Sequence, residues 1–486
     1  MKQNHMLRRL FAASVSAAIV VSLTPAANAA EPNPLNDYLT EFSQYWQAPS
    51  EPYDGTGAGG KVLNSKVLAD NDRIIQAINQ AAAIGATADS PTSQQRRALS
   101  DRDADKDVAH EFKDGFGPIL GEYFEEGYNN GDLDKVKEVM ESNGWSGNPS
   151  KEVNQYPRPY TQRDTWLPSK DYLTAGSNDM GDLSATLNIY QVPDAEGSDG
   201  KTHSASYPKN SYEGSFPSGH TNKAYSRGVV LATMIPQLAP EILARTSEAG
   251  NNRIVLGVHY PLDVMAGRIG GMASYATYWK ANEAIVKEAS AELQSYLSFR
   301  CKEDGYGDTL AQCISNTGAD DDRGYSNDFT DIVSTEPVTD RTSALKAYRA
   351  RMTYGFSQVG EAGQSFTAPD EAALLLSYAY PTLTNEQRNT VLSATAIDSG
   401  YAFDASSKGW QRIDLAKALS SKVTLDTQGE VINVEDAKAP EVVIASESSA
   451  ANEQEQSHIL PVIGAVTVII AIIAIVTITA TKRKRV

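Results

Sequence analysis

Three short segments of the 486-residue chain combine basic or imidazole side chains with a neighbouring proline. Cationic side chains bind oxyanions, and an imidazole transfers protons or attacks as a nucleophile near neutral pH. Together these residue types predict a pocket that holds an anion and acts on it by acid–base and nucleophilic chemistry. The residues are Lys151 and Arg158 in KEVNQYPRP, His220 in FPSGH, and Arg253, His259 and Asp263 in NNRIVLGVHYPLD.

The segment FPSGH predicts the start of a helix that continues into TNKAYSRGVVLATMI. Ser218 is a favoured helix cap, and the free N–H groups at a helix start bind anions. Gly219 leaves the backbone accessible, and His220 in the first turn is placed to give a proton to the leaving group of a bound anion. The alternative is that Ser218 only caps the helix and His220 is an ordinary polar residue there.

The segment HYPLD predicts a second helix start, because proline suits the first helical turn. Asp263 in that turn can reach back to the ring of His259. A carboxylate on one imidazole nitrogen fixes the tautomer and leaves the other nitrogen free to attack. For this pair alone, a capping contact is the alternative. Lys151 and Arg158, taken alone, would be interpreted as two solvated cations.

In register, the three segments resemble the signature of the PAP2 superfamily, in the branch of the bacterial class A non-specific acid phosphatases. That signature consists of K-x6-R-P, P-S-G-H and S-R-x5-H-x3-D. One position departs from it: Asn252 stands where the family usually has serine, and its amide can still donate a hydrogen bond. The long interval between Pro159 and Pro217 predicts an inserted loop near the site. The matching residues are Lys151, Arg158, Pro159, Pro217, Ser218, Gly219, His220, Arg253, His259 and Asp263.

The resemblance implies an all-α helical bundle of the PAP2 acid phosphatase type, which hydrolyses phosphate monoesters without a metal or other cofactor. It implies that His259 attacks phosphorus to form a phosphohistidine, that Asp263 orients His259, and that His220 acts as general acid and base. His220 must be protonated when the reaction starts, and an unperturbed histidine has a pKa of about 6.5. We therefore expect activity to be highest at a mildly acidic pH. The residues expected to bind phosphate are Lys151, Arg158, Ser218, Gly219 and Arg253.

Three other functions are considered on the same fold. The first is a vanadate-dependent haloperoxidase, which would use the same anion pocket and the matching histidine to hold vanadate. The second is a lipid-phosphate phosphatase, although members of that group that act within the bilayer have several membrane spans. The third is a surface adhesin that has lost catalysis, and the intact set of His220, His259 and Asp263 with three cations speaks against it.

The overall charge limits the partners. The chain has 61 acidic and 43 basic residues and a formal net charge of −18. General nucleic-acid binding requires a basic face, so nucleic acid is excluded as a partner. The expected partner is a small phosphorylated substrate, bound in a local basic pocket of an acidic protein.

Helical periodicity predicts the elements that must hold the motifs. We expect one globular domain over 30–430, with the motif core at 150–280 and a helical C-terminal extension at 335–420. KVTLDTQGEVINV is the one clear strand pair, with a Gln-Gly turn. His110 and His203 show no partner pattern and are interpreted as surface or packing residues. The helices expected before the motifs cover 67–86, 106–128 and 133–144.

Both ends of the chain carry targeting signals. Residues 1–29 have a basic start, an apolar run and an Ala-Asn-Ala site, which predicts a secretory signal peptide cleaved near Ala29 or Ala30 rather than an uncleaved anchor. Residues 431–458 are acidic and rich in Ala and Ser, which predicts a solvated stalk. The uncharged stretch 459–481 is long enough to cross a bilayer, and the basic tail 482–486 would stay in the cytoplasm.

These signals predict an exported protein whose catalytic domain is extracellular and anchored in the membrane or the cell wall. LPVIG at 460–464 resembles the LPxTG sorting signal of Gram-positive surface proteins, but Ile463 replaces the threonine at the cleaved bond. A plain membrane anchor is therefore at least as well supported as attachment by a sortase.

The two cysteines are Cys301 and Cys313. In an exported chain the default expectation is one disulfide that closes a small loop, and two free thiols are the alternative. Two cysteines at this spacing do not form the ligand set of a structural zinc site, and no metal site is expected.

Overall fold

The computed structural model describes residues 34–50, 60–87, 89–103, 106–162, 187–207, 213–333 and 336–445. The expected signal peptide, the membrane helix at 459–481, the LPVIG segment and the basic tail all lie outside these residues. Within the part of the chain that is described, no helix is both long and apolar enough to cross a membrane.

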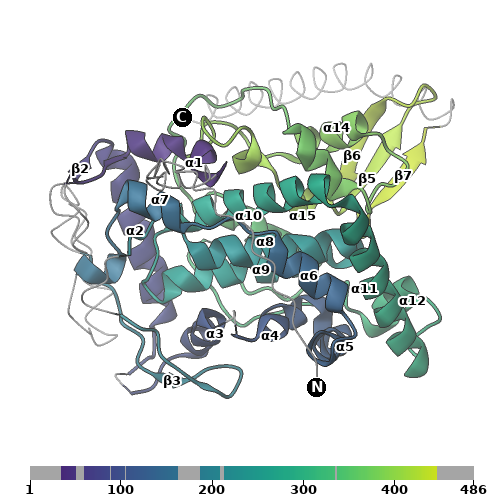
Figure 1. Ribbon diagram of the computed structural model, residues 1–486, viewed down its shortest axis with the longest axis horizontal. Helices are drawn as coiled ribbons and strands as arrows, with labels where there is room; N and C mark the ends of the chain where they lie inside the picture. The colour runs from purple at the N-terminus through teal and green to yellow at the C-terminus, as the bar shows by residue number, and fades with distance from the viewer. Residues whose placement is uncertain are drawn as a thin grey trace, which may run out of the picture.

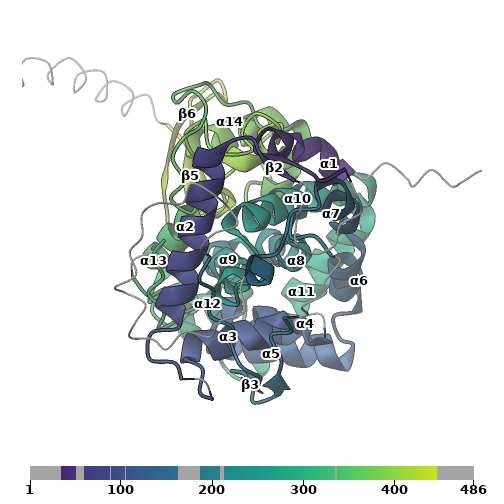
Figure 2. The same ribbon diagram turned by 90° about the vertical axis from the view of Figure 1, so that its left-hand side faces the viewer.

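Three long helices form the centre of the molecule (Figure 1 and Figure 2). They are α8 (Gly219–Met234), α9 (Ala239–Val255) and α10 (Pro261–Ala281), and they pack on one another. Every residue of α9 is buried, including Arg253. A helix without an exposed face belongs in the interior of a large core. Its polar side chains must be paired or bind a ligand, because an unpaired buried charge is costly.

One glycine allows α10 to approach the start of α8. A Cβ on Gly267 would lie 2.8 Å from the carbonyl oxygen of Ser218 and 2.8 Å from Cβ of Thr221. Contacts this short do not occur between real side-chain and backbone atoms, so a larger residue would push the helices apart. The glycine therefore fixes the start of α8 beside the first turns of α10.

Further helices surround the core (Figure 1). The expected helices at 67–86 and 133–144 correspond to α2 and α6. The expected single helix at 106–128 is wrong: the 3₁₀ segment η3 (Lys113–Phe116) separates α4 from α5, and Gly117 has a φ of +74°, which a continuous helix cannot contain. The surrounding helices are α2 (Ser65–Ala82), α3 (Ser93–Arg102), α4 (Val108–Phe112), α5 (Gly117–Asn130), α6 (Asp134–Ser142), α7 (Asn148–Asn154), α11 (Glu283–Glu303) and α12 (Leu310–Thr317).

Short elements connect these helices. Two pairs of two-residue strands are antiparallel, β1 with β2 and β3 with β4. The indole of Trp46 in β1 donates to the carbonyl of Asn154 (3.0 Å), which ties the N-terminal region to the end of α7. The short elements are α1 (Pro34–Tyr38), η1 (Thr40–Gln44), β1 (Trp46–Gln47), β2 (Lys61–Val62), η4 (Pro159–Gln162), β3 (Ala195–Glu196), β4 (Thr202–His203) and η5 (Pro236–Leu238).

The C-terminal part packs on the core and ends in a small sheet. Buried Arg268 of α10 donates to the backbone (2.8 Å) and side-chain (2.7 Å) oxygens of Gln411, which joins the two parts. The expected helical extension therefore belongs to the same globular body. Its elements are α13 (Arg341–Arg351), η6 (Asp370–Leu376), α14 (Asn385–Thr395), η7 (Trp410–Arg412), α15 (Leu415–Ala418), β5 (Ser421–Leu425), β6 (Val431–Asp436) and β7 (Glu441–Ile444).

The three-stranded sheet has the order β6-β5-β7. The expected strand pair is confirmed, because β5 and β6 are antiparallel with Val423 opposite Val434. The boundary at residue 431 between domain and stalk is wrong, because β6 and β7 lie beyond it and β7 pairs with β5 in parallel. Val434 and Val442 pack against the core, so this stretch is structured. The protein is thus mainly helical rather than all-α.

Cys301 and Cys313 form a disulfide that joins the end of α11 to α12. Both cysteines are fully buried. Their sequence separation is 12 residues, so the bond closes a short loop. A crosslink of this size stabilises the fold mainly by restricting the unfolded chain.

Replacing both cysteines with alanine should lower the free energy of unfolding by about 2–3 kcal/mol, the range for a loop of this length. The measurement is guanidinium unfolding of the double variant beside the wild type. Wild type treated with a thiol reductant provides the control and should shift in the same direction. A variant as stable as the wild type would show that the bond adds nothing to the fold.

Candidate active site

The first motif lies on α7 and just after it. The Lys151 and Arg158 side chains are buried, with exposed fractions of 7% and 8%. Helix α7 ends at Asn154, and the left-handed φ of +44° at the following Gln155 changes the chain direction. Nη1 of Arg158 then donates to the carbonyl of Val258 (3.0 Å) and lies 3.1 Å from Nε2 of His259. Neither residue is a solvated cation, and the first motif contacts the third.

The second motif forms the start of α8. Oγ of Ser218 accepts from the backbone N–H (3.3 Å) and the hydroxyl (2.9 Å) of Thr221, so it caps the helix as expected. The backbone N–H of Ser218 donates to the carbonyl of Asp263 (3.0 Å), which joins the second motif to the third. A Cβ on Gly219 would meet no atom within 4 Å, so nothing packs against this side of Gly219.

The third motif pairs a buried histidine with a buried carboxylate. Nδ1 of His259 lies 3.1 Å from Oδ2 of Asp263. The same oxygen accepts from the backbone N–H of Tyr260 (2.8 Å) and from the hydroxyl of Ser215. Asp263 thus caps α10 and also orients the imidazole, so the capping contact and the orienting contact expected from the sequence are both present. With Nδ1–H donating to Asp263, Nε2 is unprotonated and has the lone pair that a nucleophile needs, which in the empty site accepts from Nη1 of Arg158.

Arg253 on α9 has donors that no described group of the protein uses. Its Nε and Nη1 are buried and have no hydrogen-bond partner among the described residues. Burial lowers its pKa, and the nearby charges of Arg158 and Arg102 lower it further. A buried guanidinium with unused N–H groups is costly, and an oxyanion would satisfy it.

The pKa values show an excess of positive charge in a buried space. Burial, reinforced by Arg158, lowers the pKa of Lys151 to about 7 and that of Arg253 to about 9. Burial and the same cations lower the pKa of His259 well below its usual value, so the ring stays neutral. Burial raises the pKa of Asp263 to about 7, while donation from Ser215 acts against the rise. Such a space favours a bound anion.

His220 lies in the first turn of α8 and is partly exposed. Its Nε2 lies 3.2 Å from the backbone carbonyl oxygen of Arg102. Its charge contributes to the lowered pKa of His259, so the two imidazoles lie within electrostatic reach of each other. The expected site residues are therefore assembled from α7, α8, α9 and the start of α10.

Asn252 has a structural partner rather than an exposed amide. Its Nδ2 donates to Oδ2 of Asp101 (2.7 Å). The same carboxylate oxygen accepts from the guanidinium of Arg245 (3.1 Å), and all three side chains are buried. The residue that replaces the family serine thus helps to attach α9 to the end of α3.

Sequence reasoning missed two residues of this site, Ser215 and Glu213. Ser215 donates to Asp263, and the only signal for it was its position three residues ahead of Ser218. The carboxylate of Glu213 contacts both Lys151 and Arg158. No sequence pattern indicated that contact, because the partners are 62 and 55 positions away.

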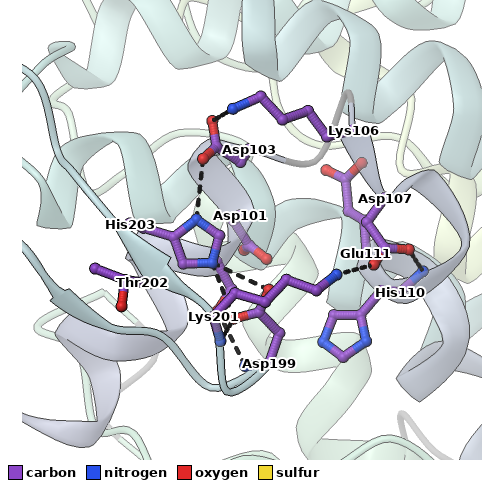
Figure 3. A pocket seen from close by; sticks show the side chains of 11 residues that line it. Asp101, Asp103, Lys106, Asp107, His110, Glu111, Asp199, Lys201, Thr202 and His203 are labelled. Atoms are coloured by element: carbon purple, nitrogen blue, oxygen red, sulfur yellow. Dashed lines mark hydrogen bonds and ion pairs between the residues drawn. The ribbon is translucent and has the colours of Figure 1, made fainter.

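A cavity of about 210 Å³ lies between the end of α3, the start of α4 and the β3–β4 hairpin (Figure 3). His203 there is buried, with Nδ1 3.0 Å from Asp103 and Nε2 2.9 Å from Asp199. Lys201 pairs with Asp107 (2.7 Å). His203 is thus a buried residue of the cavity lining with two carboxylate partners, which the sequence did not indicate. The charges of this cavity are largely paired with one another.

Comparison with known proteins agrees with this geometry. Residues 140–286 match the PAP2 superfamily. An acid phosphatase of Zymomonas mobilis is 47% identical over 57 residues, which cover 12% of this chain and 22% of the relative. Non-specific acid phosphatases of Providencia stuartii and Salmonella typhi are each 39% identical, over 69 and 64 residues. These alignments cover 14% and 13% of this chain.

The chain therefore spans only 22–28% of the length of these curated relatives. The matched region includes all three motifs and the helices that hold them. Residues 140–286 thus match the PAP2 superfamily, and short stretches of the chain resemble bacterial non-specific acid phosphatases in sequence.

Proposed function

We propose that the chain is a PAP2-type phosphatase that hydrolyses phosphate monoesters through a phosphohistidine on His259. One observation supports this most directly: buried Arg158 lies 3.1 Å from Nε2 of a neutral His259, whose Nδ1 is held by Asp263. Lys151 and Arg253 add buried positive charge to the same space. A nucleophilic nitrogen surrounded by cations suits attack on a dianionic phosphate ester.

In the first step, the lone pair of His259 Nε2 attacks phosphorus. The P–N bond forms, the ester P–O bond breaks, and His220 gives its proton to the leaving alkoxide. Asp263 accepts from Nδ1–H and balances the charge of the phosphorylated ring. Lys151, Arg158 and Arg253 bind the non-bridging oxygens, whose charge they stabilise in the transition state.

In the second step, neutral His220 takes a proton from a water molecule that attacks phosphorus. The new P–O bond forms and the P–N bond breaks, which releases orthophosphate and restores neutral His259. The N–H groups at the start of α8 can bind the same oxyanion, as free N–H groups at a helix start commonly do.

The test is turnover by the purified protein without added vanadate. The substrates are p-nitrophenyl phosphate and a long-chain phosphatidic acid in detergent micelles. A third assay, to which vanadate is added, measures the oxidation of bromide by hydrogen peroxide. Monoester hydrolysis supports the proposal, and a strong preference for the lipid substrate favours the lipid-phosphate alternative. Bromide oxidation without ester hydrolysis indicates a haloperoxidase. A folded protein that is inactive in all three assays indicates an adhesin.

We also propose that the protein is exported and held at the cell surface by 459–481. The apolar segments at both ends support this, as does the disulfide, since such bonds persist outside the cytosol. Truncation before residue 459 should release the domain into the medium, whereas retention would refute membrane anchoring. If a sortase cuts LPVIG, the untruncated gene should yield a protein that is found in the wall fraction instead of the membrane.

Loss of charge on Lys151 should steepen the alkaline fall in activity that begins when His220 loses its proton. Because its pKa is lowered to about 7, Lys151 is cationic below that pH and becomes neutral as the pH rises through it. We expect this deprotonation to add up to about tenfold per pH unit to the fall in kcat/KM for p-nitrophenyl phosphate above this value. Lys151→Arg keeps its charge and should therefore show a shallower alkaline fall than the wild type. An identical alkaline slope in both proteins would contradict the assignment.

A further inference from the structure

The carboxylate of Glu213 lies against the cations assigned to the substrate. Its Oε1 contacts Nζ of Lys151 and lies 3.3 Å from Nη2 of Arg158. Nε of Arg158 also donates to the backbone carbonyl of Glu213 (3.3 Å). The two cations are buried, whereas 56% of the Glu213 side chain is exposed. An acidic side chain thus reaches from the surface onto a buried pair of cations.

The contact is made at the place where a phosphoryl oxygen would bind. Arg158 places Nη2 near Glu213 and Nη1 3.1 Å from Nε2 of His259. A phosphate attacked by Nε2 would have its oxygens within reach of the same guanidinium and of Lys151. Two anions cannot use the same N–H donors at once, and their like charges repel each other.

We propose that Glu213 competes with phosphate for Lys151 and Arg158, so that its carboxylate must leave the two cations before a substrate binds. This inference rests on the proposed function of the site. In the empty enzyme, Glu213 compensates two buried charges that would otherwise be costly. The same contact weakens binding of substrate and of the orthophosphate product, which lets the product dissociate.

The size of the effect follows from the fraction of molecules whose cations are available. If Glu213 holds them in about nine molecules out of ten, the apparent dissociation constant of phosphate rises about tenfold. Because the competing group belongs to the chain, its effect does not depend on protein concentration. The competition acts on every phosphate ester alike, so it changes affinity rather than the choice of leaving group.

The experiment compares Glu213→Gln with the wild type in the full chain. Glutamine keeps the shape of the side chain but removes its charge. We expect the inhibition constant of orthophosphate and the KM of p-nitrophenyl phosphate each to fall about tenfold. Glu126→Gln is the matched control: Glu126 is similarly exposed (52%) and pairs with Arg300 (2.6 Å), but it joins α5 to α11. That control should leave both constants unchanged.

The opposite result would overturn the inference. If Glu213 instead holds Lys151 and Arg158 in position for the substrate, both constants will rise in Glu213→Gln. Unchanged constants would show that the contact does not compete. Glu213→Ala provides a second variant, since removing the whole side chain must shift both constants in the same direction. Thermal unfolding of each variant checks that the fold is intact.

A separate measurement distinguishes failure of this inference from failure of the proposed function. Calorimetric titration with orthophosphate reports on binding without requiring turnover. If the wild type binds phosphate but hydrolyses no ester, the proposed function fails. Tighter phosphate binding by Glu213→Gln would then still support competition at this anion site. If both proteins bind phosphate equally, the competition is refuted whatever the activity.

Discussion

Replacing His259 with alanine should reduce kcat/KM for p-nitrophenyl phosphate by roughly 10⁴-fold or more, as expected when a covalent nucleophile is removed. Nε2 of His259 is the atom on which the phosphoryl group is transferred, and no other described imidazole has a carboxylate on one nitrogen and Arg158 on the other. The measurements are initial rates and acid- or alkali-quenched trapping of a phosphorylated protein. The phosphoenzyme should be alkali-stable and acid-labile in the wild type and absent from the variant.

His203 provides the matched control for this substitution. Like His259, it is buried and bonded to an aspartate four positions away, in this case Asp199. His203→Ala therefore removes an imidazole–carboxylate pair at a comparable cost to packing, without touching the nucleophile. It should retain activity within a few-fold of the wild type. Comparable losses in both variants, or trapped phosphoenzyme in His259→Ala, would rule out His259 as the nucleophile.

Replacing Asp263 with asparagine should lower kcat by roughly 10⁴-fold, the scale seen when an orienting carboxylate beside a catalytic histidine is lost. Oδ2 of Asp263 accepts from His259, Tyr260 and Ser215. An amide at this position allows the imidazole to place its proton on Nε2, which removes the attacking lone pair. It also removes the negative charge that balances the phosphorylated ring.

Ser215→Ala is a milder change than Asp263→Asn, because it leaves the carboxylate in place. It removes one donor to the carboxylate while leaving those of His259 and Tyr260 in place. Since donation from Ser215 lowers the pKa of Asp263, its loss should raise that pKa and move the acid limit of the kcat profile to higher pH. Retention of more than a tenth of the wild-type kcat by Asp263→Asn would show that His259 needs no orienting carboxylate.

The residues of the motifs could be found from the sequence because their local roles leave local signals. Ser218 caps α8 directly after a proline, and Asp263 lies in the first turn of α10. The contacts that join the motifs leave no such signal. Arg158 meets His259 across 101 positions, and Asp101 meets Arg245 across 144. Only the resemblance to a known signature linked these segments before the structure was available.

Composition is a poor guide just after the expected strand pair. Residues 435–441 combine Glu435, Asp436 and Glu441 with Ala437, Ala439 and Pro440, which is also typical of linkers. Strands β6 and β7 nevertheless extend into this stretch, because β5 offers a partner on each side and because Val434 and Val442 pack against the core. Strand formation of this kind depends on a neighbour that local composition cannot reveal.

The two halves of the anion pocket differ in how firmly the fold holds them. His259 and Asp263 lie at the start of α10 in the interior, whereas Lys151 lies on α7, a helix of seven residues whose Val153 is 62% exposed. A short peripheral helix can open in sub-global fluctuations that leave the interior closed. An oxyanion held by both halves would couple them, so occupancy of the pocket would slow amide hydrogen exchange in α7 and hardly alter it in α9.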